Sequence, residues 1–338
     1  MPGTWFETLF GFAEGPYDET RDRFLVEGDA LVSRVNGRRF GVGRFSTPSL
    51  SELREASEGL RPGSLRVSHE RVDDVLSLHA RADNEGALFQ VASQLNCLEF
   101  ADPSEVPEDG VTQYASDPTQ GPACSLAAGA ATVFRNYFVD VAGASGQTRD
   151  RQLDNLADLR ARLGDAGQLV EVRNGYTSST PERLEALGAV LEAADRDALL
   201  AALRIGLQTN VEVTFASRFE PPAEPRFVSQ AFCSALSCGY ASGTLRQWRP
   251  LATIVLDAAY EATLRAATVD AATGRGSGKV WLTFLGGGAF GNAPDWIAHA
   301  IGRALRLLED RDLDVRVAHH REIDDEMCRS IEEAASTR

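Results

Sequence analysis

The sequence predicts an α/β protein with three layers, α/β/α, around a mixed and largely parallel sheet. In the second half of the chain, helical segments alternate with short apolar runs, as in "PLATIVLDAAYEATLRAATVD", "KVWLTFLG", "PDWIAHAIGRALRLLED" and "DLDVRVAH". This alternation favours a sheet that is covered by helices on both faces. A chain of 338 residues, 43% apolar and 25% charged, suits one large globular domain or two modest ones.

The first segment is expected to form a small lobe that contains a β-hairpin. "RFLVEGDALVSRVNGRRFGVGRF" alternates apolar and polar residues around Asn36 and Gly37, a pair typical of a type I′ turn. "TPSLSELREAS" follows and predicts a helix capped by Thr47 or Ser49. We therefore expect an N-terminal α+β lobe or extension at residues 1–80.

The remaining elements form the expected α/β/α domain at residues 81–325. "GALFQVASQLNCLEF" indicates a buried strand that leads into a polar loop, and a proline-rich loop then continues to a small-residue helix that starts near Pro122. "TRDRQLDNLADLRARLGD" predicts an amphipathic surface helix, and "GQLVEVRNGY" a strand with a turn at Asn174 and Gly175. "NVEVTFA" and "RFVSQAFCSAL" predict further strands. The middle region, about 145–225, is elaborated.

Charge and composition limit the classes of partner. The formal charge of −15 gives an extended nucleic acid no electrostatic reason to bind. No apolar run approaches the roughly 20 residues of a membrane helix, so no membrane contact is expected. The N-terminus carries acids early and no basic segment, so we expect no secretory signal and a cytoplasmic location. The sequence does not predict an oligomeric state.

The cysteines and histidines predict neither disulfides nor a metal. Five cysteines at irregular spacing favour buried small apolar residues, and Cys233 has no histidine nearby to act as its base. None of the five histidines stands at metal-ligand spacing from a cysteine or an acid. The pair His319 and His320 is expected on a surface loop. We therefore expect no metal and no cofactor.

A glycine-rich loop joins the strand at Val280 to the helix at Pro294. Such a loop exposes backbone N–H groups at the carboxyl end of a strand, and the next helix N-terminus adds a partial positive charge. A phosphate or diphosphate is the natural ligand, although the glycines could also serve only tight packing. The segment lacks the lysine of a Walker A loop and the context of a dinucleotide-binding fingerprint. The expected ligand-binding residues are Gly286, Gly287, Gly288, Ala289, Phe290, Gly291 and Asn292.

A second set of polar residues follows the strand near Gln90. Carboxylate and amide groups at a strand end suit a sugar, and a carboxylate there could position a water. Glu99 and Asp117 are the candidate catalytic residues, although Glu99 could be a solvated loop residue and Asp117 or Thr119 a helix cap. The expected ligand-binding residues of this set are Asn96, Thr119, Gln120 and Gly121.

The segment "KVWLTFLGGGAFGNAPDWIAHAIGRAL", with the helix before it, resembles the C-terminal half of a macrodomain. Gly288, Ala289, Phe290 and Gly291 match the Gly-x-Phe/Tyr-Gly loop of that ADP-ribose-binding family. The resemblance implies that this loop wraps the diphosphate, with Phe290 against the distal ribose. Asn96, at the end of "FQVASQLNC", matches the position that contacts that ribose. The resemblance covers roughly 86–138 and 250–318, and it lacks the paired glutamates of poly(ADP-ribose) glycohydrolases.

The sequence therefore predicts a protein that binds an ADP-ribose-type nucleotide and possesses candidate groups for hydrolysis of an ADP-ribosyl linkage. Three alternatives stay open. The chain could be a nucleotide-binding module without chemistry, or a structural or interaction protein whose glycine loop only packs. It could also be an enzyme that acts on another sugar phosphate.

Overall fold

The central sheet has seven strands in the order β4-β11-β12-β6-β13-β14-β5. This computed structural model describes residues 3–217 and 219–337. Strands β12, β6, β13, β14 and β5 run parallel, and β11 is antiparallel to both β12 and β4. The sheet strands are β4 (Arg44–Ser46), β5 (Arg66–Val72), β6 (Leu88–Ala92), β11 (Gly206–Glu212), β12 (Phe227–Cys233), β13 (Lys279–Leu282) and β14 (Asp314–His320).

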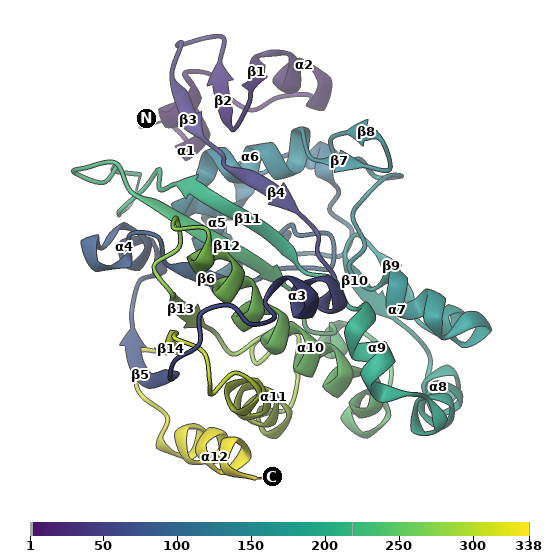
Figure 1. Cartoon of the computed structure of the whole chain (residues 1–338). Coiled ribbons are helices and arrows are strands. Elements are labelled where there is room, and N and C mark those ends of the chain that lie inside the picture. The colour runs from purple at the N-terminus through teal and green to yellow at the C-terminus, as the bar shows by residue number, and fades with distance from the viewer. Residues whose placement is uncertain (1–2, 218, 338) are drawn as a thin grey trace.

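Helices cover both faces of the sheet, as the sequence predicts for this fold class (Figure 1). One layer contains the long α10 (Leu245–Ala272), with α3 (Leu50–Ala56), α8 (Pro181–Ala193), α9 (Arg196–Ala202), α11 (Pro294–Leu307) and α12 (Asp325–Ser336) packed beside it or on one another. The other layer contains α4 (Val75–Ala80), α5 (Gln120–Ala127) and α6 (Gly129–Tyr137). The three-layer α/β/α architecture is therefore confirmed.

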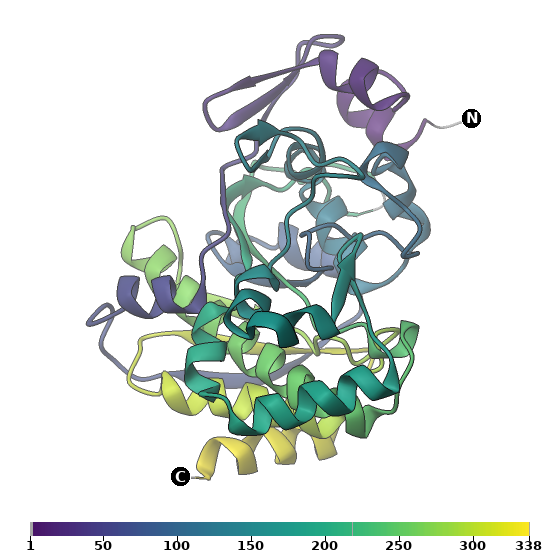
Figure 2. The same cartoon turned by 90° about the vertical axis from the view of Figure 1, so that its right-hand side faces the viewer.

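The N-terminal lobe lies at the opposite end of the molecule from α12 (Figures 1 and 2). It consists of α1 (Trp5–Phe10), α2 (Tyr17–Asp22), β1 (Phe24–Glu27), β2 (Ala30–Ser33) and β3 (Arg39–Gly41). An aromatic cluster of α1 residues packs it against α6. Strands β4 and β5 also fall within residues 1–80, yet they are the two edge strands of the central sheet. The projecting lobe is thus shorter than the predicted one.

Two asparagine–glycine pairs form different turns. Asn174 and Gly175 have φ of 49° and 77°, as a type I′ turn requires, and they join β9 (Glu171–Arg173) to β10 (Tyr176–Ser178). At the β2–β3 connection only Gly37 has a positive φ, of 72°. There the side chain of Asn36 donates to the Leu9 carbonyl and accepts from the Arg38 N–H. The expectation of a type I′ turn at Asn36 was therefore wrong.

The predicted surface helix at 148–165 is mostly absent. Only α7 (Ala157–Arg162) is α-helical there; β7 (Asp140–Val141) and β8 (Ala144–Ser145) precede it. Side chains accept hydrogen bonds from backbone N–H groups that a longer helix would use. Gln147 accepts from the Leu153 N–H, and Asp154 accepts from the Leu156 N–H. The amphipathic pattern does not reveal these hydrogen bonds between side chains and backbone.

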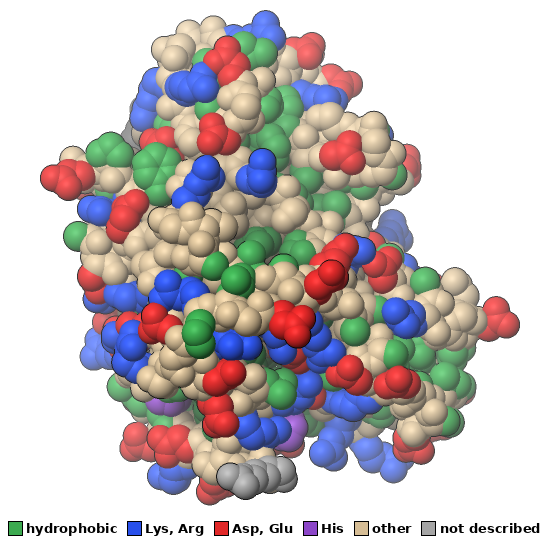
Figure 3. All heavy atoms as spheres, in the orientation of Figure 1, with side chains coloured by type: hydrophobic (Ala, Val, Ile, Leu, Met, Phe, Trp, Pro, Cys, Tyr) green, Lys and Arg blue, Asp and Glu red, His purple; other side chains and the backbone are tan. Residues whose placement is uncertain are grey.

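No helix of the described residues is long and apolar enough to cross a bilayer. On the face drawn in Figure 3, basic and acidic side chains are interspersed rather than gathered into separate regions. This face therefore presents no basic stripe of the kind that binds a nucleic acid.

Candidate active site

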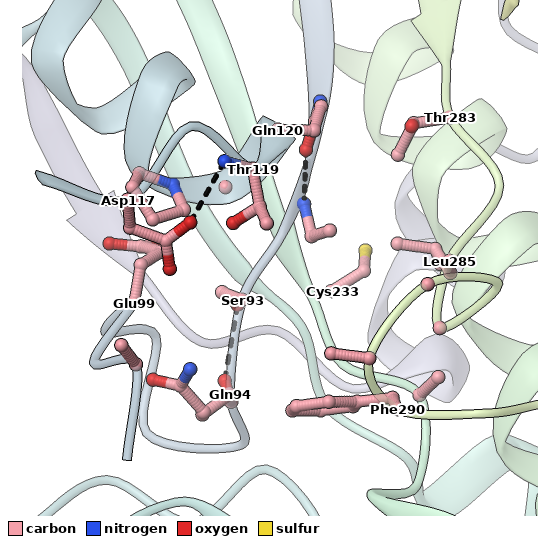
Figure 4. A pocket seen from close by; sticks show the side chains of 18 of the residues that line it. Ser93, Gln94, Glu99, Asp117, Thr119, Gln120, Cys233, Thr283, Leu285 and Phe290 are labelled. Atoms are coloured by element: carbon pink, nitrogen blue, oxygen red, sulfur yellow. Dashed lines mark hydrogen bonds between the residues drawn. The ribbon is translucent and has the colours of Figure 1, made fainter. Parts of the chain in front are cut away.

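A cavity of about 390 Å³ opens at the carboxyl ends of β12, β6 and β13. After β6 the chain continues to β11 and β12, which lie to one side of β6 in the sheet order, and it then crosses to β13, the neighbour on the other side of β6. Open α/β sheets bind ligands at such points, where the strand order reverses. Figure 4 shows the loop after β6 on one wall and the loop after β13 on the other. The lining residues include Ser93, Gln94, Glu99, Asp117, Thr119, Gln120, Gly121, Tyr176, Cys233, Tyr240, Thr283, Leu285, Gly286, Gly288, Ala289 and Phe290.

The crevice exists because β6 and β13 pair over only two residues of each strand. Beyond that point the side chain of Gln120 hydrogen-bonds the backbone groups at the unpaired edge of β6. Its carbonyl oxygen accepts from the Ala92 N–H at 2.8 Å, and its amide donates to the Gln90 carbonyl at 2.8 Å. Gln120 therefore holds the N-terminus of α5 against β6, and both the oxygen and the nitrogen of its side-chain amide are hydrogen-bonded.

The first turn of α5 faces the cavity without a side-chain cap. Thr119 is the N-cap residue, but its hydroxyl makes no capping hydrogen bond, and Asp117 instead accepts from the Thr119 N–H at 2.8 Å. Gly121 lets this turn approach β6, since a Cβ there would lie 2.0 Å from the Ala92 carbonyl oxygen. The turn thus offers unpaired N–H groups and the positive end of the helix dipole.

The loop after β13 turns its backbone toward the same space. Gly286 and Gly291 have φ of 73° and 68°, and the Asn292 N–H donates to the Gly286 carbonyl at 2.9 Å. Within the described residues, the N–H groups of Gly288, Ala289 and Phe290 have no hydrogen-bond partner. An anionic group in the cavity can therefore be bound by backbone donors alone.

Glu99 is buried in the wall of the cavity, with 2% of its surface exposed. Its Oε2 accepts from the Ser125 hydroxyl at 2.7 Å and from the Arg135 guanidinium at 3.3 Å. Its Oε1 has no hydrogen-bond partner among the described residues. Burial raises the pKa of Glu99 to about 7, against the opposing effects of Arg135 and Ser125. A carboxyl group with this pKa can exchange a proton near neutrality.

Two neighbours hold Glu99 in position. Arg135 of α6 is fully buried, stacks 3.8 Å from the Phe232 ring centroid, and donates to the Cys97 carbonyl. Gln94 makes a paired hydrogen bond with the backbone N–H and carbonyl of Phe100. Because both supports are buried, the Glu99 carboxyl is fixed relative to the cavity.

An aromatic corner closes one end of the cavity. The ring of Phe290 lies 5.5 Å from that of Tyr176 and 5.8 Å from that of Tyr240. The Tyr176 hydroxyl donates to the Phe100 carbonyl at 2.6 Å, which fixes this ring, whereas Tyr240 is 46% exposed. A flat or partly apolar ligand group, such as a sugar or a base, fits against these faces.

A second cavity of about 540 Å³ adjoins the first. The two share lining residues from the α5 turn and from the loop after β13, so a ligand can pass over these backbones from one to the other. The second cavity is largely apolar, with Val75, Phe284 and Ile297 in its wall and Asp73 and Asp74 also lining it.

No family model and no curated protein sequence matches the chain. Among solved structures, it is similar to the poly(ADP-ribose) glycohydrolase of Deinococcus radiodurans in complex with ADP-ribose, with 13% identity, 87% of this chain and 94% of that chain covered, and a TM-score of 0.45.

It is also similar to the poly(ADP-ribose) glycohydrolase of Thermomonospora curvata, with 13% identity, coverage of 93% and 94%, and a TM-score of 0.44. The same enzyme bound to the inhibitor ADP-HPD gives 14% identity, coverage of 92% and 93%, and a TM-score of 0.43. At this degree of overlap, the ligand and the reaction of this chain have to be inferred from its own side chains.

The structure brings most of the candidate site residues to one cavity. From both loops, those that line it are Glu99, Asp117, Thr119, Gln120, Gly121, Gly286, Gly288, Ala289 and Phe290. Gly287 lines the second cavity instead. Glu99 is no solvated loop residue, and neither Asp117 nor Thr119 caps α5 through its side chain, so these alternative interpretations were wrong.

Three candidates lie outside the lining of both cavities. Asn96 is fully buried, and its amide donates to Gln152 while its oxygen accepts from the Leu98 N–H. Asn292 is buried and donates to the Leu236 carbonyl. Gly291 accompanies Asn292 in the turn. Asn96 and Asn292 therefore shape the loops, and contact of Asn96 with a ribose stays a prediction.

The cavity also contains groups that the sequence did not single out. Tyr240 and Thr283 line it, and Ser125 and Arg135 contact Glu99 from the helices behind it. Ser125 and Arg135 come from "CSLAAGAATVFR", where the small-residue pattern indicates burial but not the direction of a polar side chain.

Cys233 lines the cavity but is no nucleophile in this arrangement. Burial raises the pKa of its thiol to about 12, so the thiolate is scarce at neutral pH. Its sulfur lies 3.4 Å from the Thr263 hydroxyl.

The raised pKa of Glu99 predicts a specific pH dependence of stability. The native state keeps a proton on Glu99 between about pH 4.5 and about pH 7, where the unfolded chain loses it. The free energy of unfolding of the wild type, relative to Glu99→Gln, is therefore expected to fall as pH rises through this window. The total change is on the order of 3 kcal/mol. Urea titrations across this range measure it, and a difference that increases with pH would contradict the assignment.

Proposed function

We propose that the chain binds an ADP-ribose-type nucleotide across the two cavities and hydrolyses the glycosidic bond at its distal ribose. One observation carries this proposal. Glu99 is buried, is held by Arg135, and lines a cavity that lies between an uncapped helix N-terminus and a loop of free backbone N–H groups. Such a site combines a proton-transfer group with donors for a diphosphate.

The diphosphate is assigned to the gap between the two loops. The N–H groups of Gly288, Ala289 and Phe290 approach it from one side, and the first turn of α5 approaches it from the other. These donors are local, so a small dianion binds in spite of the overall charge of −15.

The orientation of the nucleotide follows from the position of Glu99. The reacting ribose belongs in the first cavity, because Glu99 and Asp117 are there and the aromatic corner offers ring faces. The adenosine then extends into the second cavity, whose apolar walls suit a base.

The proposed reaction uses a proton from Glu99. The protonated carboxyl donates to the leaving-group oxygen as the bond from the anomeric carbon to that oxygen breaks. A water molecule then adds to the anomeric carbon, and its proton returns to the Glu99 carboxylate. Asp117 uses one oxygen to accept from the Thr119 N–H, and within the described chain its other oxygen is free to orient that water. The reaction needs no cofactor.

A substitution at Gly288 tests the diphosphate assignment. A Cβ at Gly288 would meet no atom within 4 Å, so Gly288→Val is expected to fold and to fill the space of the ligand. We expect its affinity for ADP-ribose to fall by roughly 100-fold, the effect of a blocked phosphate site worth about 3 kcal/mol. Isothermal titration calorimetry measures the affinity, and circular dichroism checks the fold.

Gly15→Val is the matched control, because a Cβ at Gly15 also meets no atom within 4 Å and Gly15 lies in the N-terminal lobe. Gly286→Ala is the contrasting variant, since its Cβ would lie 2.4 Å from the Cβ of Ala235 and should disturb the loop itself. Equal ADP-ribose affinity of wild type and folded Gly288→Val would refute the binding mode.

A further inference from the structure

Two histidines and a cysteine meet at the edge of the sheet, away from Glu99. They are His69 of β5, His319 of β14 and Cys328 of α12. One ligand atom from each lies within 4.8 Å of the other two. His319 and His320 are the last residues of β14, and His319 is 1% exposed, so the expectation of a surface loop was wrong for His319.

We propose that His69, His319 and Cys328 bind a divalent cation of the zinc class. Imidazole nitrogen and thiolate sulfur are the donors that Zn²⁺ prefers in proteins, and three such donors from one face suit a tetrahedral ion with a fourth position. The proposal is independent of the function proposed above.

The distances are close to those of a tetrahedral site. Nδ1 of His69 lies 2.8 Å from Nε2 of His319, and Sγ of Cys328 lies 3.8 Å from the same Nε2. Metal–nitrogen bonds of about 2.0 Å and metal–sulfur bonds of about 2.3 Å would separate these pairs by roughly 3.3 and 3.5 Å. These two pairs therefore require shifts of about half an ångström or less, whereas Nδ1 of His69 and Sγ of Cys328, which lie within 4.8 Å of each other, have to approach by up to about 1.3 Å.

The surroundings favour a cation. The carboxylates of Asp324, Asp325 and Glu332 lie close enough to Cys328 to act on it electrostatically. These carboxylates attract a divalent ion. Glu332 follows Cys328 by one turn of α12, which places it on the same face of the helix as a candidate fourth ligand.

The hydrogen bonds show which protons the cation replaces. Nδ1 of His319 accepts from the Asp324 N–H at 3.1 Å, so the ring proton of His319 is on Nε2, facing His69. A metal at Nε2 moves this proton to Nδ1, and the thiol of Cys328 releases its proton to solvent. The Nδ1–H then loses the hydrogen bond from the Asp324 backbone N–H, so the chain beside Asp324 has to shift when the metal binds.

The cation would fasten α12 to the sheet. Asp324 is the N-cap of α12 and Cys328 lies in its second turn, whereas His69 and His319 belong to the last two strands of the sheet. Met327, next to Cys328, lines the second cavity. A metal at this place would therefore stabilise one wall of that cavity as well as the C-terminal helix.

Cobalt titration of the full-length protein tests the proposal. Protein stripped with a chelator is titrated with Co²⁺ while its absorption spectrum is recorded. We expect one equivalent to bind, with visible d–d bands and a near-ultraviolet charge-transfer band from the thiolate, and we expect Zn²⁺ to displace it. Zn²⁺ should also raise the melting temperature of the stripped protein.

The variants separate this site from adventitious binding. Cys328→Ser, at a partly exposed position, should fold and lose the charge-transfer band. His69→Gln should bind Co²⁺ roughly 100-fold more weakly or worse. His299→Gln, on the exposed face of α11, is the matched control and should behave as wild type. A wild-type spectrum without the thiolate band, or equal binding by wild type and His69→Gln, would overturn the proposal.

Discussion

Glu99→Gln is expected to slow hydrolysis of an ADP-ribosyl linkage by roughly 10²- to 10⁴-fold, the usual contribution of a general acid or base. The amide has the shape of the carboxyl group but cannot pass a proton to the leaving group or receive one from water. Because Glu99 contributes no diphosphate donor, the affinity for ADP-ribose should change by only a few-fold. Release of ADP-ribose from a labelled substrate measures the rate, and calorimetry the affinity.

The pH profile distinguishes a catalytic role of Glu99 from a structural one. If Glu99 is the general acid, the wild-type rate should fall as pH rises through about 7, because the neutral form of Glu99 is lost. The residual rate of Glu99→Gln should lack this limb. Glu58→Gln, at an exposed position of the opposite layer, is the matched control. A Glu99→Gln variant that folds and hydrolyses substrate at the wild-type rate would refute the role.

Arg135→Met is expected to be the most destabilising single change among those discussed. It leaves Glu99 without its cationic partner in a fully buried position, and breaking a buried ion pair in this way typically costs about 3–5 kcal/mol. The cost should be smallest below about pH 5, where Glu99 keeps its proton in the native state, and largest above pH 7. Urea unfolding at these two pH values measures the difference.

A double variant checks that the cost comes from the pair. In the Glu99→Gln background no carboxylate is left unpaired, so Arg135→Met should cost less than it does in the wild type. Arg135→Lys keeps the charge and should lie between wild type and Arg135→Met. An equal cost of Arg135→Met in both backgrounds, at both pH values, would mean that the loss of packing against Phe232 dominates and that the ion pair contributes nothing.

Local patterns predicted much of the fold. The alternation of helices and apolar runs after residue 244 corresponds to α10, β13, α11 and β14. Asn174 and Gly175 form the turn that their pattern predicts. The pattern at 148–165 misled because the side chains of Gln147 and Asp154 accept hydrogen bonds from backbone N–H groups that a longer helix would need. The spacing of apolar residues does not predict such hydrogen bonds between side chains and backbone.

The parts of the candidate site that lie in loops after strands were predictable from the sequence. Glu99 lies in the loop after β6 and the segment from Gly286 to Phe290 in the loop after β13, and parallel strand ends meet at one edge of a sheet. The contact between Arg135 and Glu99 was not predictable, because the tertiary packing of α6 and not the local sequence brings Arg135 to Glu99. The same is true of His69 and His319, which are 250 residues apart in the sequence and 2.8 Å apart in the structure.

The most direct test of the proposed ligand is isothermal titration calorimetry of the wild-type protein with ADP-ribose, with AMP and ribose 5-phosphate as controls. If the two cavities bind the two ends of one nucleotide across a diphosphate, ADP-ribose should bind with micromolar affinity or better. Each control occupies only one cavity and should bind at least roughly 100-fold more weakly. No heat with ADP-ribose, or equal affinity for ribose 5-phosphate, would contradict the proposed nucleotide site.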